Sequence, residues 1–375
     1  DTVTSVTKEV TAVDGTVTKE VDTQDGTVTT TVTKDDTVTS VTKEVTTSDG
    51  KATVTSEDDG TVTATNTDGT VTKYVPVSET NTADFPKPEI VNGEVKVTLV
   101  EGKYTQAVTK TNGIITVTQP NGTVTEYVPM TQNRVLYPKV VTHNGEVTVT
   151  TTDDTFTKVV TEPNGTVIVN AHDGTITETV PIPGTNNFPK TFIQSDGTVK
   201  VTAVEGTYTQ AVTFSGTSYS PLGPKGTLVL TASDGTNTVI VPDKGTNEFP
   251  MKTVGDDGRL TFSAKDGTYT TIVTAKDGST ITVTESNDTT TKYFSDDSTS
   301  PLTHTITNDD GKVTVYGQEG PVTKQVTASD GTVTVVDSNG TKFITAEDGS
   351  VTVTSTDGTK MEYIPTDAST NPINT

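Results

Sequence analysis

Hydrophobic and polar residues alternate along most of the chain in short runs, and glycine-containing turns separate the runs. In one stretch, Asp68-Gly69 is followed by Thr70-Val71-Thr72 and then by Lys73-Tyr74-Val75-Pro76. Alternation with a period of two is typical of a half-buried strand, and β-branched Val and Thr suit a pleated sheet. Proline has no N–H for the strand ladder, so it ends the strand. Copies of this turn-strand-proline stretch begin at Asp68, Asn121, Asp173, Asp234 and Asp357, with a degraded copy at Asn287.

The glycines indicate the kind of turn. Asp-Gly and Asn-Gly suit the two central positions of a type I′ hairpin turn, where both residues need a positive φ. Glycine also recurs about every nine to eleven residues along much of the chain, which disfavours amphipathic helices. We therefore expect antiparallel hairpins throughout.

Longer repeats enclose these stretches. Glu101 to Thr109 recurs nearly intact as Glu205 to Thr213, and Asp1 to Thr11 recurs without change as Asp36 to Thr46. An aromatic residue precedes the proline in Phe85-Pro86, Tyr137-Pro138, Phe188-Pro189 and Phe249-Pro250, and Pro301 continues the series. These prolines are 51 to 61 residues apart. The predicted units are residues 1–84 with a possible donor strand at 1–13, 85–136, 137–187, 188–248 with a loop insertion, 249–300, and 301–375 with a tail.

One middle unit contains four turns and therefore about five strands. The turns fall at Asn92-Gly93, Glu101-Gly102, Asn112-Gly113 and Asn121-Gly122. Even spacing predicts a single inward face formed by Val95, Val97, Leu99, Tyr104, Val108, Ile115, Val117, Val124 and Val128.

The apolar content of one unit is too small for it to fold alone, so neighbouring units must share sheets or stack their faces, or strands must come from another chain. The predicted fold is all-β: a tandem array of short antiparallel hairpin or meander repeats of about 51 residues. We expect these repeats to pack as sandwich-like or barrel-like β modules.

The composition of the chain limits the kinds of molecule that it can bind. The chain is 29% hydrophobic with a net charge of −23 and a pI near 4.4. Such values are typical of disorder, but the β-branched residues here are placed by position. The acidic balance disfavours nucleic acid and anionic membranes, and no apolar run is long enough for membrane insertion. With Asp1 first and no signal peptide, we expect a processed N-terminus, with a cytoplasmic start as the alternative.

Candidate catalytic chemistry is sparse. The three histidines, His143, His172 and His304, are far apart, the chain has no cysteine, and no Gly-x-Ser-x-Gly elbow occurs. We predict no enzymatic activity and no cofactor. Acidic pairs could bind Ca²⁺ or could simply be solvated turns: Asp58-Asp59, Asp153-Asp154, Asp256-Asp257, Asp296-Asp297 and Asp309-Asp310.

Four asparagines match the N-glycosylation pattern: Asn121, Asn164, Asn287 and Asn339. In a protein rich in Asn-Gly-Thr hairpins, the same triplets also arise by chance. Glycans are therefore candidate modifications or partners.

The N-terminal segment points to assembly. Residues 1–13 precede the first Asp-Gly turn, and they carry the candidate donor-strand residues Val3, Val6, Val10 and Val13. A terminal β segment can pair with an exposed sheet edge of a neighbouring molecule or within its own chain. Both alternatives are open from the sequence.

Threonine makes up about a quarter of the chain. Together with the Asp-Gly turns, acidic surface and tandem units, this resembles bacterial or archaeal extracellular β-repeat surface proteins, such as pilus-like fibre subunits or adhesin stalks. The resemblance implies a non-enzymatic structural protein at the cell surface that polymerises with itself through β-strand contacts, with donor-strand exchange by the N-terminal segment as one route. A monomeric adhesin or glycan-binding stalk is the first alternative, and a Ca²⁺-stiffened surface-layer protein is the second.

Overall fold

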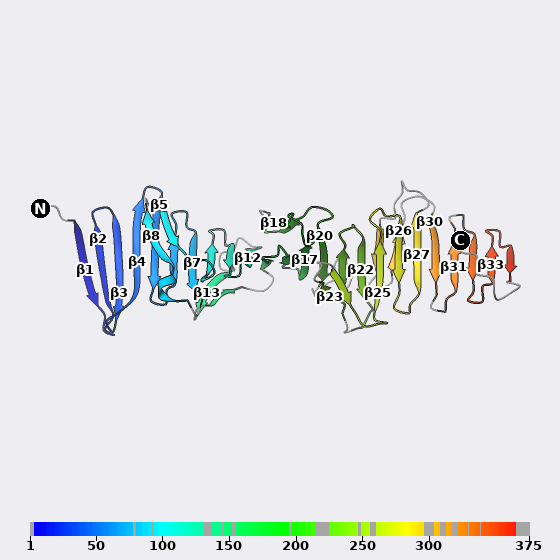
Figure 1. The fold of residues 1–375 in the computed structure, drawn as a ribbon, viewed down its shortest axis with the longest axis horizontal. Coiled ribbons are helices and arrows are strands. Elements are labelled where there is room, and N and C mark those ends of the chain that lie inside the picture. Colours follow the sequence, from blue (N-terminus) through cyan, green and yellow to red (C-terminus); the bar gives the residue numbers. More distant parts are fainter. Residues whose placement is uncertain are drawn as a thin grey trace. The chain divides into compact units, whose positions relative to one another are not determined.

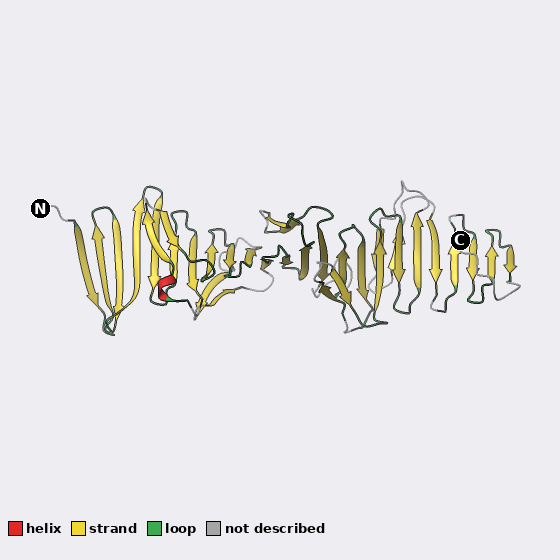
Figure 2. Ribbon diagram, in the orientation of Figure 1, coloured by secondary structure: helices red, strands yellow, loops and turns green. Residues whose placement is uncertain are grey.

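The structure is a computed structural model. It describes residues 4–77, 80–91, 94–130, 137–143, 146–151, 155–194, 197–214, 225–246, 249–255, 260–295, 304–307, 313–316, 322–328, 330–337 and 339–364. The chain divides into two compact units, residues 1–172 with 191–200 and residues 173–190 with 201–375. Within the described residues, strands account for nearly all of the regular structure, together with one 3-10 turn at Thr82–Asp84 (Figure 2).

Among its described residues, the first unit contains an antiparallel main sheet and hairpins that lie outside it (Figure 1). The main sheet runs in the pairing order β1 (Ser5–Thr11), β2 (Val17–Thr23), β3 (Thr27–Lys34), β4 (Thr37–Thr47), β5 (Gly50–Glu57), β6 (Val62–Thr65), β7 (Val71–Pro76), β10 (Tyr104–Thr109), β11 (Ile115–Thr118), β12 (Val124–Pro129), β15 (Phe156–Thr161) and β16 (Val167–Asn170). The hairpins are β8 (Lys87–Val91) with β9 (Glu94–Thr98), and β13 (Lys139–His143) with β14 (Glu146–Thr150).

The second unit repeats this plan. Its main sheet runs in the order β17 (Thr175–Pro181), β20 (Tyr208–Phe214), β21 (Leu228–Thr231), β22 (Asn237–Pro242), β25 (Tyr269–Thr274), β26 (Thr280–Thr284), β27 (Thr290–Ser295), β30 (Val322–Thr327), β31 (Val333–Val336), β32 (Lys342–Thr345), β33 (Val351–Thr354) and β34 (Lys360–Tyr363). Separate two-stranded sheets of this unit are β23 (Met251–Val254) with β24 (Leu260–Ser263) and β28 (His304–Thr307) with β29 (Val313–Tyr316). The two-stranded sheet of β18 (Lys190–Ile193) and β19 (Val199–Thr202) has residues in both units.

The Asp-Gly loops have a different turn type from the predicted one. At Asp14-Gly15 only the glycine has a positive φ, +83°. The N–H of Gly15 donates to the carbonyl of Ala12 (3.1 Å), and the N–H of Ala12 donates to the carbonyl of Thr16 (2.8 Å). This is a three-residue loop, a type I turn followed by a left-handed glycine. The type I′ prediction is therefore wrong here. Two successive positive φ values occur instead in the Asp35-Asp36 loop, 48° and 60°.

The aspartate side chain explains this preference. The carboxylate of Asp14 accepts the backbone N–H of Thr16, two residues on, at 3.1 Å. The asparagines do the same through their amide oxygen, as when Asn121 accepts the N–H of Thr123 at 2.9 Å. Such a side-chain acceptor stabilises a type I turn without requiring a positive φ at the Asp or Asn itself.

These hydrogen bonds predict a specific pH dependence. Backbone N–H donors lower the pKa of Asp330, Asp348 and Asp357 below the ordinary value of 3.8. A lowered folded-state pKa adds stability above pH 3.8, and this stability is lost as the pH falls through the folded-state pKa. The variant with asparagine at all three positions keeps the hydrogen-bond acceptors but cannot be protonated. We expect its melting temperature to fall less than that of the unmodified protein between about pH 4 and 2. Equal losses would contradict this assignment.

Hairpins outside the main sheet cover three-strand segments of it. The hairpin β8–β9 places Ile90, Val95 and Val97 against the buried cluster Val54, Val62 and Ala64 on β5 and β6. The hairpin β13–β14 places Val140, Val147 and Val149 against Ala107, Ile115 and Val117 on β10 and β11. Figure 1 shows these hairpin strands lying against the sheet rather than in its row. Each hairpin therefore packs on the three strands that precede it, and each covered segment is a two-layer, sandwich-like module.

Successive modules bury opposite faces of the main sheet. In the second unit, Ile240 and Val241 are adjacent on β22 and both are fully buried. Adjacent strand residues point to opposite faces. Ile240 belongs to the cluster with Leu228 and Leu230, whereas Val241 belongs to the cluster with Ile272 and others. The first unit shows the same alternation. Tyr74, which packs on the cluster of β5 and β6, lies opposite Gln106 of β10, so the two side chains share a face. Ala107, the next residue on β10, belongs to the other cluster and points to the opposite face.

The all-β fold and the tandem antiparallel meander predicted from the sequence are confirmed. The predicted single inward face is wrong in part. Ile115 and Val117 join the same cluster, but its β10 member is Ala107, so Tyr104 and Val108 lie on the other face. Val95 and Val97 pack on the preceding module. The reason is that hairpins cover the shared sheet alternately, which a pattern read within one unit does not reveal.

Each unit's main sheet has one thin end. No described residue of 4–51 is buried, and every residue of β1 is exposed. No described residue from β30 to β34 is buried either. Both terminal portions therefore have solvent on two faces, like a single-layer sheet.

Candidate functional site

The first candidate site is the outer edge of β1. This strand pairs with β2 along its whole length, from Ser5 opposite Thr23 to Thr11 opposite Val17, and among the described strands it has no second partner. The N–H of Ala12 bonds to the carbonyl of Thr16, and the N–H of Gln24 bonds to the carbonyl of Thr4. Backbone groups of even-numbered residues therefore face β2. Those of Ser5, Thr7, Glu9 and Thr11 face outward, because the direction alternates along an antiparallel strand.

An internal copy shows that this edge sequence can pair. Residues Thr37 to Thr46 of β4 are identical to Thr2 to Thr11, and β4 pairs on both sides, with β3 and with β5. The N–H of Asp58 in the β5–β6 loop donates to the carbonyl of Thr39 (3.1 Å), so odd-numbered residues of β4 face β5 and even-numbered ones face β3. Thr42, the counterpart of Thr7, lies opposite Thr30 of β3. The edge that is free in β1 is thus occupied by a Thr-Val strand in β4.

The structure places the predicted assembly residues as follows. Val6 and Val10 lie on one face of β1 and are 62% and 53% exposed. Val13 is fully exposed in the following turn, and Val3 lies outside the described residues. Within the single chain, the segment pairs with its own β2, which was one of the two alternatives. The donor-strand assignment stays a prediction about contacts between copies.

The last described strand of the second unit's main sheet presents a second edge. The strand β34 pairs with β33, and no other described strand pairs with it. The N–H of Ser355 donates to the carbonyl of Thr359 (2.9 Å), so Met361 and Tyr363 also face β33 through their backbone. The backbone groups of Lys360 and Glu362 therefore point outward. The side chains of Met361, Tyr363 and Ile364 are 47%, 57% and 70% exposed.

The predicted modification and metal positions are at turn tips. Asn121, Asn164, Asn287 and Asn339 are all exposed, and the first three accept the N–H of the threonine two residues on. Their glycosylation stays a prediction. Asp59 accepts the N–H of Thr61 at 2.7 Å, and the other four acidic pairs lie outside the described residues. In the described part of the chain, no group of three or more His, Cys, Asp or Glu residues could hold a metal ion.

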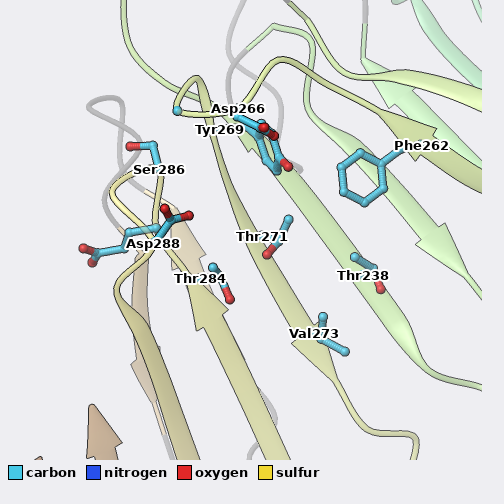
Figure 3. A pocket seen from close by; sticks show the side chains of 11 residues that line it. Thr238, Phe262, Asp266, Tyr269, Thr271, Val273, Thr284, Ser286 and Asp288 are labelled. Atoms are coloured by element: carbon cyan, nitrogen blue, oxygen red, sulfur yellow. The ribbon is translucent and has the colours of Figure 1, made fainter. Parts of the chain in front are cut away.

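A groove on the second unit was not found from the sequence. It has a volume of about 440 Å³ and lies on β25 and β26 beside the β23–β24 hairpin. The rings of Phe262 and Tyr269 meet edge to face at 5.7 Å, and Figure 3 shows Ser286 and Asp288 across the groove from them. The other lining residues are Thr238, Asp266, Gly267, Thr271, Val273, Thr284 and Glu285.

The groove forms because hairpins of successive modules cover opposite faces of the main sheet. Tyr269 and Thr271 lie on the face of Ile240, which the hairpin of the preceding module covers. The core of their own module is on the reverse face, at Ile272. The edge of one hairpin thus stands beside an uncovered patch of sheet. The sequence signal was the pair of aromatics seven residues apart, but only the fold shows that they converge.

In the part of the chain that the structure describes, no helix has the length and apolar character needed to cross a bilayer.

Comparison with known proteins adds little. No family model and no curated protein matches the chain. Among solved structures, the chain is similar to a mutant of the TCP10 domain of Danio rerio CPAP, with 15% identity over 75% of this chain and 96% of that chain and a TM-score of 0.34. It is also similar to the wild-type domain in complex with a peptide of Danio rerio STIL, with 13% identity over 96% and 100% and a TM-score of 0.21. Similarities this weak carry no argument about the site.

Proposed function

We propose that this protein is a non-enzymatic structural subunit that forms homopolymeric fibres at the cell surface by pairing the edges of its main sheets between copies. The observation that carries the proposal is the outer edge of β1, which no described strand occupies. A strand edge with unpaired N–H and C=O groups is a template for another strand, and folded proteins usually protect it. Here the edge spans Ser5–Thr11, with Thr and Val at most positions.

Edge pairing would add hydrogen bonds without burying a large apolar surface. Each backbone hydrogen bond contributes a net stabilisation of roughly 0.5–1.5 kcal/mol, so a run of outward groups along β1 supports a specific joint between copies. The thin ends of both units support the same proposal, because an uncovered single layer gains most from extension by further strands.

Proline at an outward-facing position of β1 tests the proposal. Thr7→Pro removes an N–H that faces away from β2 and leaves the β1–β2 hydrogen bonds in place. We expect the unmodified protein to form regular filaments in negative-stain electron microscopy at concentrations of about 10–100 μM, a range typical of moderate-affinity association. Thr7→Pro should abolish them, whereas Thr7→Ser should not.

Deletion of residues 1–13 would be a weaker test, because it removes β1 and exposes the edge of β2. Far-UV circular dichroism checks that Thr7→Pro is still folded. A monodisperse unmodified protein throughout the concentration range would show that the proposal is wrong. Filaments of Thr7→Pro with unchanged yield would exclude β1 from the joint.

The groove beside the β23–β24 hairpin favours a second candidate function, a glycan-binding stalk. Sugars bind where an aromatic ring covers their C–H face and nearby hydroxyls and carboxylates bond to their O–H groups. Tyr269 and Phe262 supply rings, Thr271 and Thr284 supply hydroxyls, and Asp266 supplies a carboxylate.

Titration with neutral oligosaccharides tests this candidate. We expect millimolar binding, seen as NMR shifts of residues around Tyr269, to be lost in Tyr269→Ala. The matched control is Tyr363→Ala, which removes an exposed tyrosine on β34. If glucose, galactose, mannose and N-acetylglucosamine oligomers all leave the spectrum unchanged, the groove is not a glycan site.

A further inference from the structure

On the two edges that no described strand occupies, the outward backbone groups belong to residues of opposite numbering, odd on one and even on the other. On β1 the outward backbone groups belong to odd-numbered residues such as Thr7 and Glu9, and on β34 they belong to Lys360 and Glu362. Two strand edges can form backbone hydrogen bonds only if the residues whose N–H and C=O groups point outward on one strand lie opposite such residues on the other strand. An antiparallel joint between β1 and β34 must therefore place odd-numbered residues of one opposite even-numbered residues of the other.

We infer that β1 of one copy pairs antiparallel with β34 of a second copy, in the register that places Glu9 opposite Lys360. This inference rests on the proposed fibre function and identifies its joint. The occupant of the β1 edge is thus a second copy of this chain, bound head to tail. A heterologous contact of this kind generates an open filament when its rotation does not close into a ring.

Charge selects this register from its neighbours. With Glu9 opposite Lys360, the joint contains a cross-strand ion pair between opposite charges. A shift of two residues in one direction places Glu9 opposite Glu362, which repels. A shift in the other direction places Glu9 opposite Gly358 and removes the ion pair.

The apolar side chains agree with the same register. It places Val6, 62% exposed, opposite Tyr363, 57% exposed, and it places Lys8 opposite Met361. An aromatic residue opposite a β-branched one is a favourable cross-strand pair, and the lysine stem covers the methionine. Large side chains that are exposed in the single chain are thereby covered.

Self-pairing of either edge is the competing arrangement. Pairing of β1 with a second β1 that brings Val6 opposite Val10 places Lys8 opposite Lys8, so like charges meet. Pairing of β34 with a second β34 can place Lys360 opposite Glu362, but it joins only two copies by itself. These arrangements are outcomes of the test below.

Engineered cysteines give a direct test, since the chain contains none. Val6 and Tyr363 would form a non-hydrogen-bonded pair in the joint, where side chains approach closely enough for a disulfide. We expect Val6→Cys/Tyr363→Cys, after mild oxidation under assembly conditions, to shift from monomer to a ladder of multimers on a non-reducing gel. The matched control Thr7→Cys/Tyr363→Cys places the first thiol on the opposite face and should stay monomeric.

Single variants identify the competing joints. Dimers from Lys8→Cys alone would assign β1 self-pairing, and dimers from Met361→Cys alone would assign β34 self-pairing. Either result overturns the inference. Filaments in electron microscopy without a ladder from Val6→Cys/Tyr363→Cys would also overturn it while the fibre function stands. The absence of both filaments and ladder would overturn the fibre function as well.

A charge exchange confirms the register without cysteines. Glu9→Lys should raise the concentration needed for assembly about fivefold, and Lys360→Glu in the same chain should restore it. The fivefold figure corresponds to exchanging one attractive cross-strand pair for a repulsive one. Failure of the double variant to recover would contradict the proposed register.

Discussion

Replacement of Lys252 by methionine is expected to destabilise the second unit by about 3 kcal/mol, the lower end of the range for breaking a buried ion pair. Lys252 on β23 forms an ion pair with Glu178 on β17. The Glu178 side chain is only 9% exposed and the Lys252 side chain 27%. The variant would leave a carboxylate buried beneath the hairpin without its nearest cation.

Hydrogen exchange of the amides in β17, β20 and β23 measures this effect locally. The loss should be largest near pH 7 and smaller near pH 4, because a buried carboxylate without its partner has a raised pKa and becomes neutral there. The double variant Glu178→Met/Lys252→Met should recover most of the loss, since an apolar pair of similar volume has no desolvation penalty.

The matched control is the ion pair between Lys276 and Glu205, which has a 2.5 Å separation but side chains 59% and 71% exposed. Lys276→Met should leave exchange rates near it almost unchanged, because solvent screens an exposed pair. Equal effects of Lys252→Met and Lys276→Met would show that burial does not govern the contribution of these pairs.

The sequence predicted the elements better than their packing. Strand ends at Pro76 and Pro129 and turns at Asp14-Gly15 and its copies are local features, fixed by a missing N–H or a glycine φ. The alternation of covered faces depends on which way each hairpin leaves the sheet. Val128 illustrates the limit, because it is 1% exposed although it lies on the face opposite Ile115.

For the candidate sites too, local features were predictable from the sequence and long-range contacts were not. Repetition of Asp1 to Thr11 as Asp36 to Thr46 was visible in the sequence, but only the register of β4 shows that this edge accepts a partner. The groove depends on Phe262 and Tyr269 meeting across a hairpin and the sheet, and the buried Glu178 depends on a contact 74 positions away at Lys252. Contacts between elements distant in the chain leave no local pattern to read.

The aromatic-proline joints provide a further test of how the hairpins are held. The ring of Tyr137, just before the β13–β14 hairpin, lies over Gly113 in the β10–β11 loop, where a Cβ would be 2.3 Å from the ring. Phe85 lies over Gly60 and Phe249 over Gly226 with the same crowding. The glycines thus allow an aromatic residue to dock on the preceding module and start the chain back over the sheet.

We expect Gly113→Ala to destabilise this module by about 3–4 kcal/mol. Alanine at φ +86° costs about 1–2 kcal/mol, and displacement of a half-buried aromatic ring costs about another 2 kcal/mol. Gly102→Ala is the matched control, because Gly102 has a φ of +74° in the same module and nothing within 4 Å of the added Cβ. It should show the backbone cost alone in hydrogen exchange of β10 and β11.

A double-mutant cycle separates the two contributions. In a Tyr137→Ala background the ring is gone, so Gly113→Ala should then cost only what Gly102→Ala costs. If Gly113→Ala costs the same with and without the ring, Tyr137 does not pack on this glycine in solution. The hairpin would then be held by Val140, Val147 and Val149 alone, and the aromatic-proline joint would only mark where the chain leaves the sheet.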